Sequence, residues 1–337
     1  MRSLQISCTR KSKVLIWGTL TFLLLLSAIL SLCAGSVKVP LEEVVRTLFG
    51  GYSGSTAARI VRFTRLPRTC AAMLAGAALA VSGAVIQTVL YNPLASPSIV
   101  GVNSSAGLAA ALVCAIGPTA QRFAPLAAFL GALLGALLIL SLAQSTGASR
   151  MTVVLAGVVV SNLFSAGIDA LVTLVPDALN GVSDFRIGGF SGVTMTRLAP
   201  AAGMILISLV LTLSLSQELD ILSLGSDVAQ SLGLSVRSVR FLLLTLAAAL
   251  AGAAVSFSGL LGFVGLVVPH AVRRILGGES FPLLLGSMLG GASFLTICDL
   301  LSRVLFAPFE IPVGIVLAFI GAPFFLWLLL RKKGGKV

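Results

Sequence analysis

Long apolar segments separated by short polar ones dominate the pattern along this chain. A helix needs about 20 residues to cross a bilayer, and most of these segments have that length. The eighth is shorter and rich in glycine, which indicates a broken or partly buried helix. The ten predicted spans are residues 14–34, 69–90, 98–116, 123–143, 151–175, 198–216, 238–258, 262–276, 281–301 and 310–330.

Composition supports a membrane protein. Hydrophobic residues make up 57% of the chain and charged residues 10%, and the mean hydropathy is +1.08. A soluble domain with this balance would expose mostly apolar atoms to water. The 35 glycines are typical of closely packed membrane helices. We therefore predict an all-α integral membrane protein with about ten transmembrane helices, forming one transmembrane domain over residues 1–337.

Basic residues flank the first and last spans. Arg10, Lys11 and Lys13 precede the first, and RKKGGK follows the last. Because cytoplasmic loops retain Lys and Arg, and an even number of spans returns the chain to its starting side, both termini are expected in the cytoplasm. The isoelectric point near 10.4 could suggest nucleic acid. The cations lie in loops and form no basic domain, so nucleic acid is not an expected partner.

One outer loop, residues 35–68, is unusually basic for its side. Arg59, Arg62, Arg65 and Arg68 recur at every third position. A voltage-sensor helix is excluded because the preceding GGYSGSTAA is too polar for a span. A loop facing lipid headgroups remains possible. Arg65 and Arg68 precede a helix whose dipole disfavours cations there, which favours the other interpretation, a docking surface for an acidic extracytoplasmic partner.

Few other ionisable residues lie near the spans. Arg303 is expected at the outer end of the ninth span, where it can join the arginines while pairing with Asp299 four residues earlier. Asp169 is the one acid expected deep in a span. His270 is the only histidine, so no metal site is expected. The chain has no phosphate-binding or nucleophile motif, and we expect no catalytic residue and no enzyme activity.

The polar segment QELDILSLGSDVAQSLGLSVRSVR, residues 217–240, lies on the cytoplasmic side of this topology. It predicts two short helices, with Ser223 or Ser226 as a cap. Leu222, Leu232 and Leu234 would form their apolar face. Such helices suit a groove on another protein, or, alternatively, they rest on lipid.

The segment YNPLASPSIVGVNSSAGL, residues 91–108, is an unusual entrance to a span. Two prolines bracket a turn, and Asn103, Ser104 and Ser105 then enter an apolar helix. Polar side chains at membrane depth line a pathway or form hydrogen bonds between helices. Both interpretations stay open at this point.

The chain also contains a weak internal repeat. Residues 74–93 and 250–269 align with nine of twenty positions identical. The predicted topology runs these two segments in opposite directions, which predicts an inverted repeat of the kind found in transporters.

Four segments together carry a family resemblance, spread from residue 65 to residue 323. They read RLPRTCAAMLAGAALAVSGAVIQTVLYNPLASP, LGSDVAQSLG, GFVGLVVPHAVRRILG and EIPVGIVLAFIGAP. The combination resembles the FecCD family, the permease subunits of ABC importers for iron–siderophore complexes, heme and vitamin B12. The function implied is a permease of the cytoplasmic membrane. A stand-alone secondary transporter with inverted repeats is the alternative.

The resemblance also implies partners. The working unit would contain two permeases, identical or paralogous, and two ATPase subunits that use ATP and Mg²⁺, with no cofactor bound by this chain. An extracytoplasmic binding protein would deliver the substrate to Arg65, Arg68 and Arg303. Arg59 and Arg62 extend this set without belonging to the family motif.

Two further sites follow from the resemblance. Coupling helices at about 219–233 would receive the movement of the ATPases, and a cytoplasmic gate falls on TGASR, whose Gly147 and Ala148 depart from the hydroxyl pattern of the family. The identity of the chelate stays open. The predicted coupling residues are Leu224, Gly225, Asp227, Ala229, Leu232 and Gly233. The predicted pathway and gate residues are Asn92, Pro93, Asn103, Ser104, Ser105, Gly147, Ala148 and Ser149.

Overall fold

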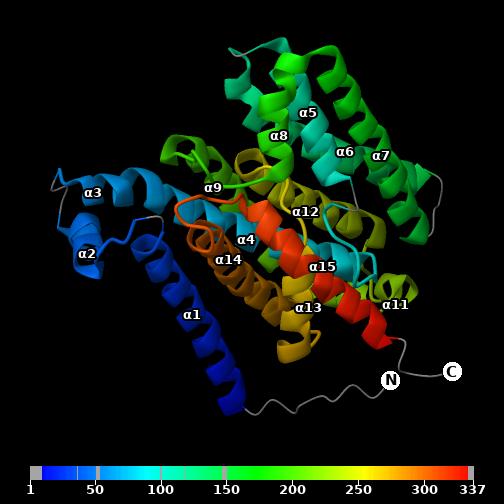
Figure 1. Cartoon of the computed structure of the whole chain (residues 1–337). Helices are drawn as coiled ribbons and strands as arrows, with labels where there is room; N and C mark the ends of the chain where they lie inside the picture. The colour runs from blue at the N-terminus through cyan, green and yellow to red at the C-terminus, as the bar shows by residue number, and fades with distance from the viewer. Residues whose placement is uncertain are drawn as a thin grey trace.

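A computed structural model describes residues 10–35, 37–50, 54–98, 101–117, 119–145 and 150–332. Every regular element in these ranges is a helix (Figure 1). The elements are α1 (Arg10–Cys33), α2 (Leu41–Phe49), α3 (Thr56–Ile60), the π-helix η1 (Val61–Arg65), α4 (Leu66–Val89), α5 (Val102–Ile116), η2 (Gln121–Phe123), α6 (Ala124–Ser145), α7 (Arg150–Leu174), η3 (Pro176–Ala178), α8 (Leu179–Ile187), α9 (Met195–Ser214), α10 (Ser216–Ser223), α11 (Ser226–Ser231), α12 (Val236–Ser258), α13 (Val264–Leu276), α14 (Ser280–Val304) and α15 (Val313–Lys332).

Each of the ten predicted spans coincides with a helix, but the count of ten transmembrane helices is not confirmed. Within the described ranges, seven helices are long and apolar enough to cross a membrane. Residues 102–116 and 313–327 form shorter apolar helices. The predicted broken span is α13, which has 13 residues and contains Pro269.

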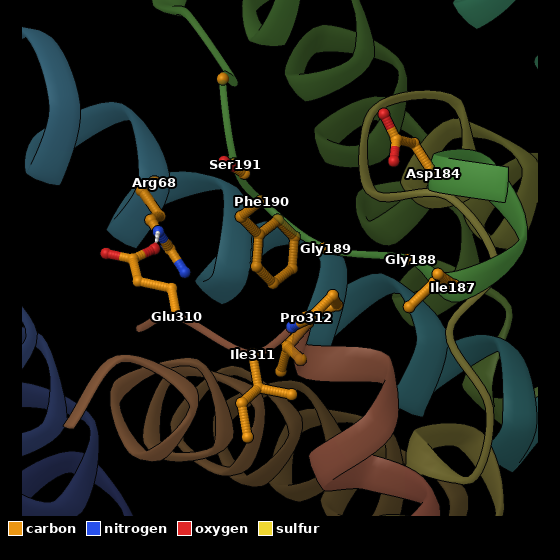
Figure 2. A pocket seen from close by; sticks show the side chains of 12 residues that line it. Arg68, Asp184, Ile187, Gly188, Gly189, Phe190, Ser191, Glu310, Ile311 and Pro312 are labelled. Carbon is orange, nitrogen blue, oxygen red and sulfur yellow. Dashed lines mark hydrogen bonds and ion pairs between the residues drawn. The ribbon is translucent and has the colours of Figure 1, made fainter. Parts of the chain in front are cut away.

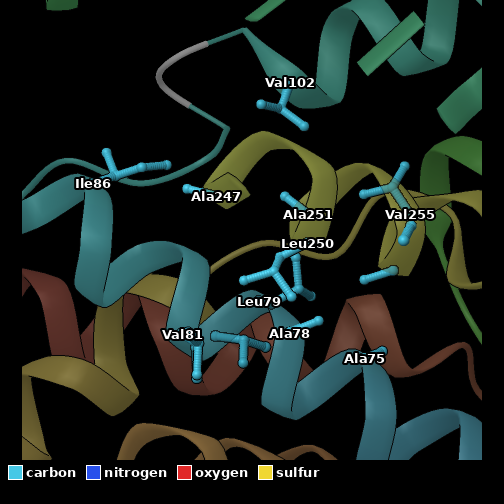
Figure 3. Packing of buried hydrophobic residues seen from close by; sticks show 14 of the residues in the cluster. Ala75, Ala78, Leu79, Val81, Ile86, Val102, Ala247, Leu250, Ala251 and Val255 are labelled. Carbon is cyan, nitrogen blue, oxygen red and sulfur yellow. The ribbon is translucent and has the colours of Figure 1, made fainter. Parts of the chain in front are cut away.

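Helix α4 lies at the centre of the bundle and packs against α14, α12, α13 and α9. Its most apolar window is 83% buried, whereas that of α1, at the edge of Figure 1, is 11% buried. Small residues allow this position: Ala75, Ala78 and Leu79 of α4 face Ala247 and Leu250 of α12 (Figure 3).

Two glycine pairs set the closest approaches of α4. A Cβ atom on Gly76 would lie 2.1 Å from the carbonyl oxygen of Gly291 in α14, and one on Gly83 would lie 1.9 Å from that of Gly265 in α13. No side chain fits at these distances, so the prediction of close helix packing through small residues is confirmed.

The two aligned segments of the predicted repeat differ in local structure. Residues 74–93 occupy α4 and the turn after it, while residues 250–269 run from α12 through a turn into α13. Helices α4 and α12 pack against each other. The inverted repeat stays a prediction.

The two ends of α14 identify the two ends of the bundle. Its last turn lies beside the end of α1 and the start of α4, which we call the arginine end. Its first residue, Ser280, donates its backbone N–H to Asp220 of α10 at 2.8 Å. Ser280 and Arg303 are about 35 Å apart at 1.5 Å per residue, so α10 and α11 lie at the opposite end.

Candidate functional site

The first four arginines diverge in their surroundings. Ser55 begins this stretch as the N-cap of α3, accepting the Ala58 N–H at 3.0 Å. The chain then passes without a break through η1 into α4. Arg59 and Arg62 point to the exposed side, whereas Arg65 and Arg68 are 4% and 8% exposed. A π-helical turn is often found at functional sites, and here it leads from the exposed arginines to the buried ones.

Arg65 binds the end of α1. Its guanidinium donates to the carbonyl oxygens of Leu32 and Cys33, each at 2.8 Å, and to that of Val37. The last carbonyls of a helix lack partners within the helix and lie at the negative end of its dipole. The cation that seemed unfavourable at the start of its own helix therefore stabilises the end of another.

Arg303 binds the same helix end from α14. It donates to the Ser31 and Ala34 carbonyl oxygens, each at 3.2 Å, and to Ser31 Oγ at 2.7 Å. Its Nε lies 3.2 Å from Asp299 Oδ2. The predicted i,i+4 pair between Asp299 and Arg303 is confirmed.

Arg68 completes the cluster with two carboxylates. Its Nε donates to Asp299 Oδ1 at 3.0 Å, and its Nη1 donates to Glu310 Oε2 at 2.6 Å. The Asp299 side chain is fully buried and lies between Arg68 and Arg303, while the Glu310 side chain is 37% exposed. Glu310 is therefore the carboxylate of the cluster that water can reach.

These contacts change the expected nature of the arginine site. Arg65, Arg68 and Arg303 do not form an exposed patch, because their donors are occupied by helix-end carbonyls and by the two carboxylates. They join α1, α4, α14 and the segment before α15. Docking through them stays a prediction, and it now requires that at least one internal contact open.

Two adjoining cavities lie beside this cluster. The first, of about 370 Å³, is bounded by Arg68 and Glu310 on one side and by Asp184 and Ile187 on the other (Figure 2). The second, of about 460 Å³, shares Asp184 with the first. Its lining also includes Arg122 and Arg197, which are exposed.

The wall between the cavities is the segment GGFSG, residues 188–192. Gly189 donates to the Ser258 carbonyl at 2.8 Å, and Gly188 accepts from the Gly314 N–H at 3.2 Å, so the segment is held between α12 and α15. Gly188 and Gly192 adopt positive φ, which favours glycine. Our sequence reasoning missed this wall, although three glycines in five residues between two spans were the available signal.

The predicted coupling segment forms two short helices, as expected. Gly225 and Gly233 have positive φ at the two ends of α11. Leu224, Asp227 and Leu232 are exposed, but Ala229 is fully buried, so Ala229 supports the helix from inside and presents nothing to a partner.

Two details of that segment were predicted wrongly. Leu222 is buried in the core and not on a shared apolar face; the exposed apolar residues are Leu224, Val228 and Leu232. Neither serine is a cap, since Gly225 is the N-cap of α11 and no side chain bonds to its first turn.

The predicted pathway residues fall into three groups. Asn92 and Pro93 form the turn after α4, where Asn92 Oδ1 accepts the Leu94 N–H at 3.0 Å. Ser104 and Ser105 bond to the Gly101 carbonyl of their own helix, and a Cβ on Gly135 of α6 would lie 2.3 Å from Ser105. That contact favours helix packing for Ser105.

Asn103 differs from the serines, because its Oδ1 is buried without a hydrogen-bond partner in the described part of the chain. Gly147, Ala148 and Ser149 lie outside the described residues. All of these assignments to a pathway stay predictions.

Two remaining ionisable residues have plain surroundings. Asp169 is not deep in a span: it is exposed near the end of α7 and lies 2.8 Å from Arg186 of α8. His270 contacts Phe324 edge-on, with ring centroids 6.1 Å apart. Within the described ranges, no three His, Cys, Asp or Glu side chains gather as a metal site would require.

Comparison with known proteins identifies the family. The model of the FecCD transport family matches residues 23–331. The chain belongs to the FecCD transport family. Its resemblance to that family in sequence is thereby confirmed, and the chain is a multi-pass membrane transport component, not an enzyme. This family membership makes the arginine end and the α10–α11 end the two places to consider for partners.

Individual relatives match over nearly their full length. The chain is 37% identical to the Fe(3+)-citrate import system permease protein YfmE of Bacillus subtilis, covering 95% of this chain and 97% of that protein. It is 36% identical to the hemin transport system permease protein HmuU of Yersinia pestis, covering 93% and 96%. A solved metal-chelate type ABC transporter in an inward-facing conformation has a TM-score of 0.81 at 30% identity, covering 95% of this chain and 99% of that one.

Proposed function

We propose that this chain is the permease subunit of a binding-protein-dependent ABC importer. It carries an iron chelate, such as ferric citrate, a siderophore complex or heme, or a cobalamin-like compound across the cytoplasmic membrane. The observation that supports this most strongly is the similarity, over 95% of the chain, to a permease of Fe(3+)-citrate import. The working unit would contain two ATPase subunits, a binding protein and a second permease copy or paralogue.

In this proposal the arginine end is extracytoplasmic and receives the binding protein. Arg59, Arg62, Arg122 and Arg197 are exposed and provide the long-range attraction for an acidic partner. The buried arginines act after contact. A partner carboxylate reaches Arg68 by replacing Glu310, because Glu310 is its half-exposed partner and Asp299 is fully buried.

Replacing Glu310 would affect the cavity directly. Glu310, Ile311 and Pro312 lead into α15 and line the cavity of about 370 Å³ (Figure 2). Release of Glu310 from Arg68 frees this segment to move, which links docking to the shape of the cavity below the partner.

The opposite end would receive the ATPases in the cytoplasm. Leu224, Val228 and Leu232 present an exposed apolar surface on α10–α11 that suits a groove on a partner. The secondary-transporter alternative loses its main residue, because Asp169 is exposed and paired with Arg186. A proton-coupled carrier would need such an acid within the bundle.

The test begins with the tagged chain, purified from its native membrane in mild detergent. A nucleotide-binding subunit in near-equal amount supports the proposal, and a chain that purifies alone contradicts it. The complex is then reconstituted with its binding protein in vesicles. Ferric citrate, a ferric hydroxamate, hemin and cobalamin are offered in turn, with and without ATP. Uptake that follows an ion gradient and ignores ATP would favour the secondary transporter.

A further inference from the structure

Helix α2 carries an apolar stripe that no described part of the chain covers. Leu41, Val45, Leu48 and Phe49 are 53%, 47%, 38% and 86% exposed. Their spacing of i, i+4, i+7 and i+8 places them on one face of the helix. Exposed apolar residues that are gathered in this way mark a contact surface more often than scattered ones do.

The helix itself is held firmly against the protein. Val44 is 2% exposed and packs in a small cluster with Leu32, Val39 and Val61. Ser55 donates to Glu43 Oε1 at 2.6 Å and so ties the next helix to this one. The stripe is therefore a fixed surface beside the ends of α1 and α3 (Figure 1).

Three sectors follow one another around α2. At 100° per residue, the buried pair Val44 and Thr47 is followed by the apolar stripe, and the stripe is followed by Glu42, Arg46 and Glu43. Protein, apolar surface and charge thus occur in the order that a helix meets at a corner between protein, lipid and water. A groove on a soluble partner gives no reason for this order.

The position of α2 along the bundle agrees with such a corner. Helix α1 exposes Phe22, Leu26, Ile29 and Leu30 along its length, as expected for a span that faces lipid. Its 24 residues extend about 36 Å, enough to cross the bilayer. It ends at Cys33, and α2 begins only eight residues later, so the stripe continues the lipid-facing surface of α1.

We propose that α2 lies in the interface of the bilayer that α1 crosses, with its stripe between headgroups and acyl chains. Lys38 and Arg46 then lie at the level of the lipid phosphates. This anchor holds the Leu32–Val37 carbonyls, which bind Arg65, at a fixed height above the membrane. The inference needs only the membrane location and is independent of the transported substrate.

Quenching of tryptophan fluorescence by lipid tests the proposal on the full chain. Native Trp17 and Trp327 are replaced by phenylalanine, and single tryptophans are introduced as Phe49→Trp or Val45→Trp on the stripe and Arg46→Trp on the charged face. The protein is reconstituted in phosphatidylcholine vesicles with or without bromine on the acyl chains. Phe49→Trp and Val45→Trp should be quenched several-fold more strongly than Arg46→Trp.

Aqueous iodide supplies the opposite measurement. It should quench Arg46→Trp strongly and the stripe positions weakly. If iodide reaches position 49 as well as position 46, the stripe faces water and the proposal is wrong. If neither quencher reaches positions 45 and 49, a second copy of the chain covers the stripe, and the proposal is equally wrong. Shielding from bromine that occurs only after binding protein is added would assign the stripe to that partner instead.

Discussion

Asp299 is the residue on which the arginine end depends most. Its carboxylate is fully buried between Arg68 and Arg303, with Nε–O distances of 3.0 Å and 3.2 Å. A buried ion pair contributes little net stability compared with an apolar pair, but removing one partner leaves a buried charge without compensation. The cost of substitution at Asp299 should therefore far exceed that at an exposed pair.

Asp299→Asn should destabilise the protein by about 3–5 kcal/mol, the cost of breaking a buried pair. The matched control is Asp169→Asn, whose partner Arg186 is also an arginine but whose side chain is 63% exposed. The control should change stability by about 0–1 kcal/mol. Thermal unfolding of both variants in the same detergent measures the difference, and equal losses would contradict the buried-pair account.

Glu310 provides the residue-scale test of docking. If a partner carboxylate replaces Glu310 on Arg68, then Glu310→Gln removes the competing charge and should tighten binding of the binding protein. The expected gain is about 1 kcal/mol, or about fivefold in Kd. Glu279→Gln, an exposed acid at the opposite end of α14, is the control. Titration by surface plasmon resonance gives both constants, and weaker or unchanged binding by Glu310→Gln would exclude the replacement step.

At the scale of elements, the contact between α4 and α14 depends on glycine. Gly76→Ala would place a Cβ atom 2.1 Å from the Gly291 carbonyl oxygen, and both backbones would have to separate. Overpacking of this kind costs about 1–3 kcal/mol or more. Gly203→Ala in α9 is the matched control, because nothing lies within 4 Å of its Cβ position. A lower unfolding temperature for Gly76→Ala alone is expected; equal behaviour would mean that the two helices slide apart at no cost.

The sequence predicted elements better than contacts, for a physical reason. Apolar runs such as 69–90 and 238–258 determine where helices form, because lipid leaves the backbone no other partner. Which arginine is buried depends on the end of α1, 28–38 residues away from Arg65 and Arg68, and no local pattern records that neighbour. The same holds for Asp169, which looked deep in a span until Arg186 of α8 was placed beside it. The GGFSG wall was missed because its partners, Ser258 and Gly314, are distant in sequence.

The exposed residues of α10–α11 belong to the scale of the whole molecule, because they matter only through a partner. Val228→Asp places a charge in the exposed apolar surface formed with Leu224 and Leu232. It should reduce copurification of the ATPase at least tenfold, since a buried unpaired charge costs more than about 1.4 kcal/mol. Gln230→Asp, also exposed on α11, should have little effect. Retained copurification by Val228→Asp would leave the ATPase without this contact surface.

Helix α14 joins the two ends of the molecule as one continuous element. Its first residue is bound by Asp220 of α10, and its last turn holds Asp299 and Arg303. A straight helix transmits displacement along its axis, so a movement of α10 should reach the arginine cluster through the Asp220–Ser280 hydrogen bond. Asp220→Ala removes that bond without touching the exposed surface of Leu224, Val228 and Leu232.

The expected result for Asp220→Ala separates assembly from transmission. The ATPase should still copurify, but stimulation of its activity by the binding protein, and ATP-driven uptake, should fall about tenfold, the loss for about 1.4 kcal/mol of coupling. Asp220→Asn retains an oxygen that can accept the Ser280 N–H, and it should restore most of both activities. If Asp220→Ala keeps full stimulation, the movement travels by another helix, with α12 next to be tested because it follows α11 directly and packs along α4.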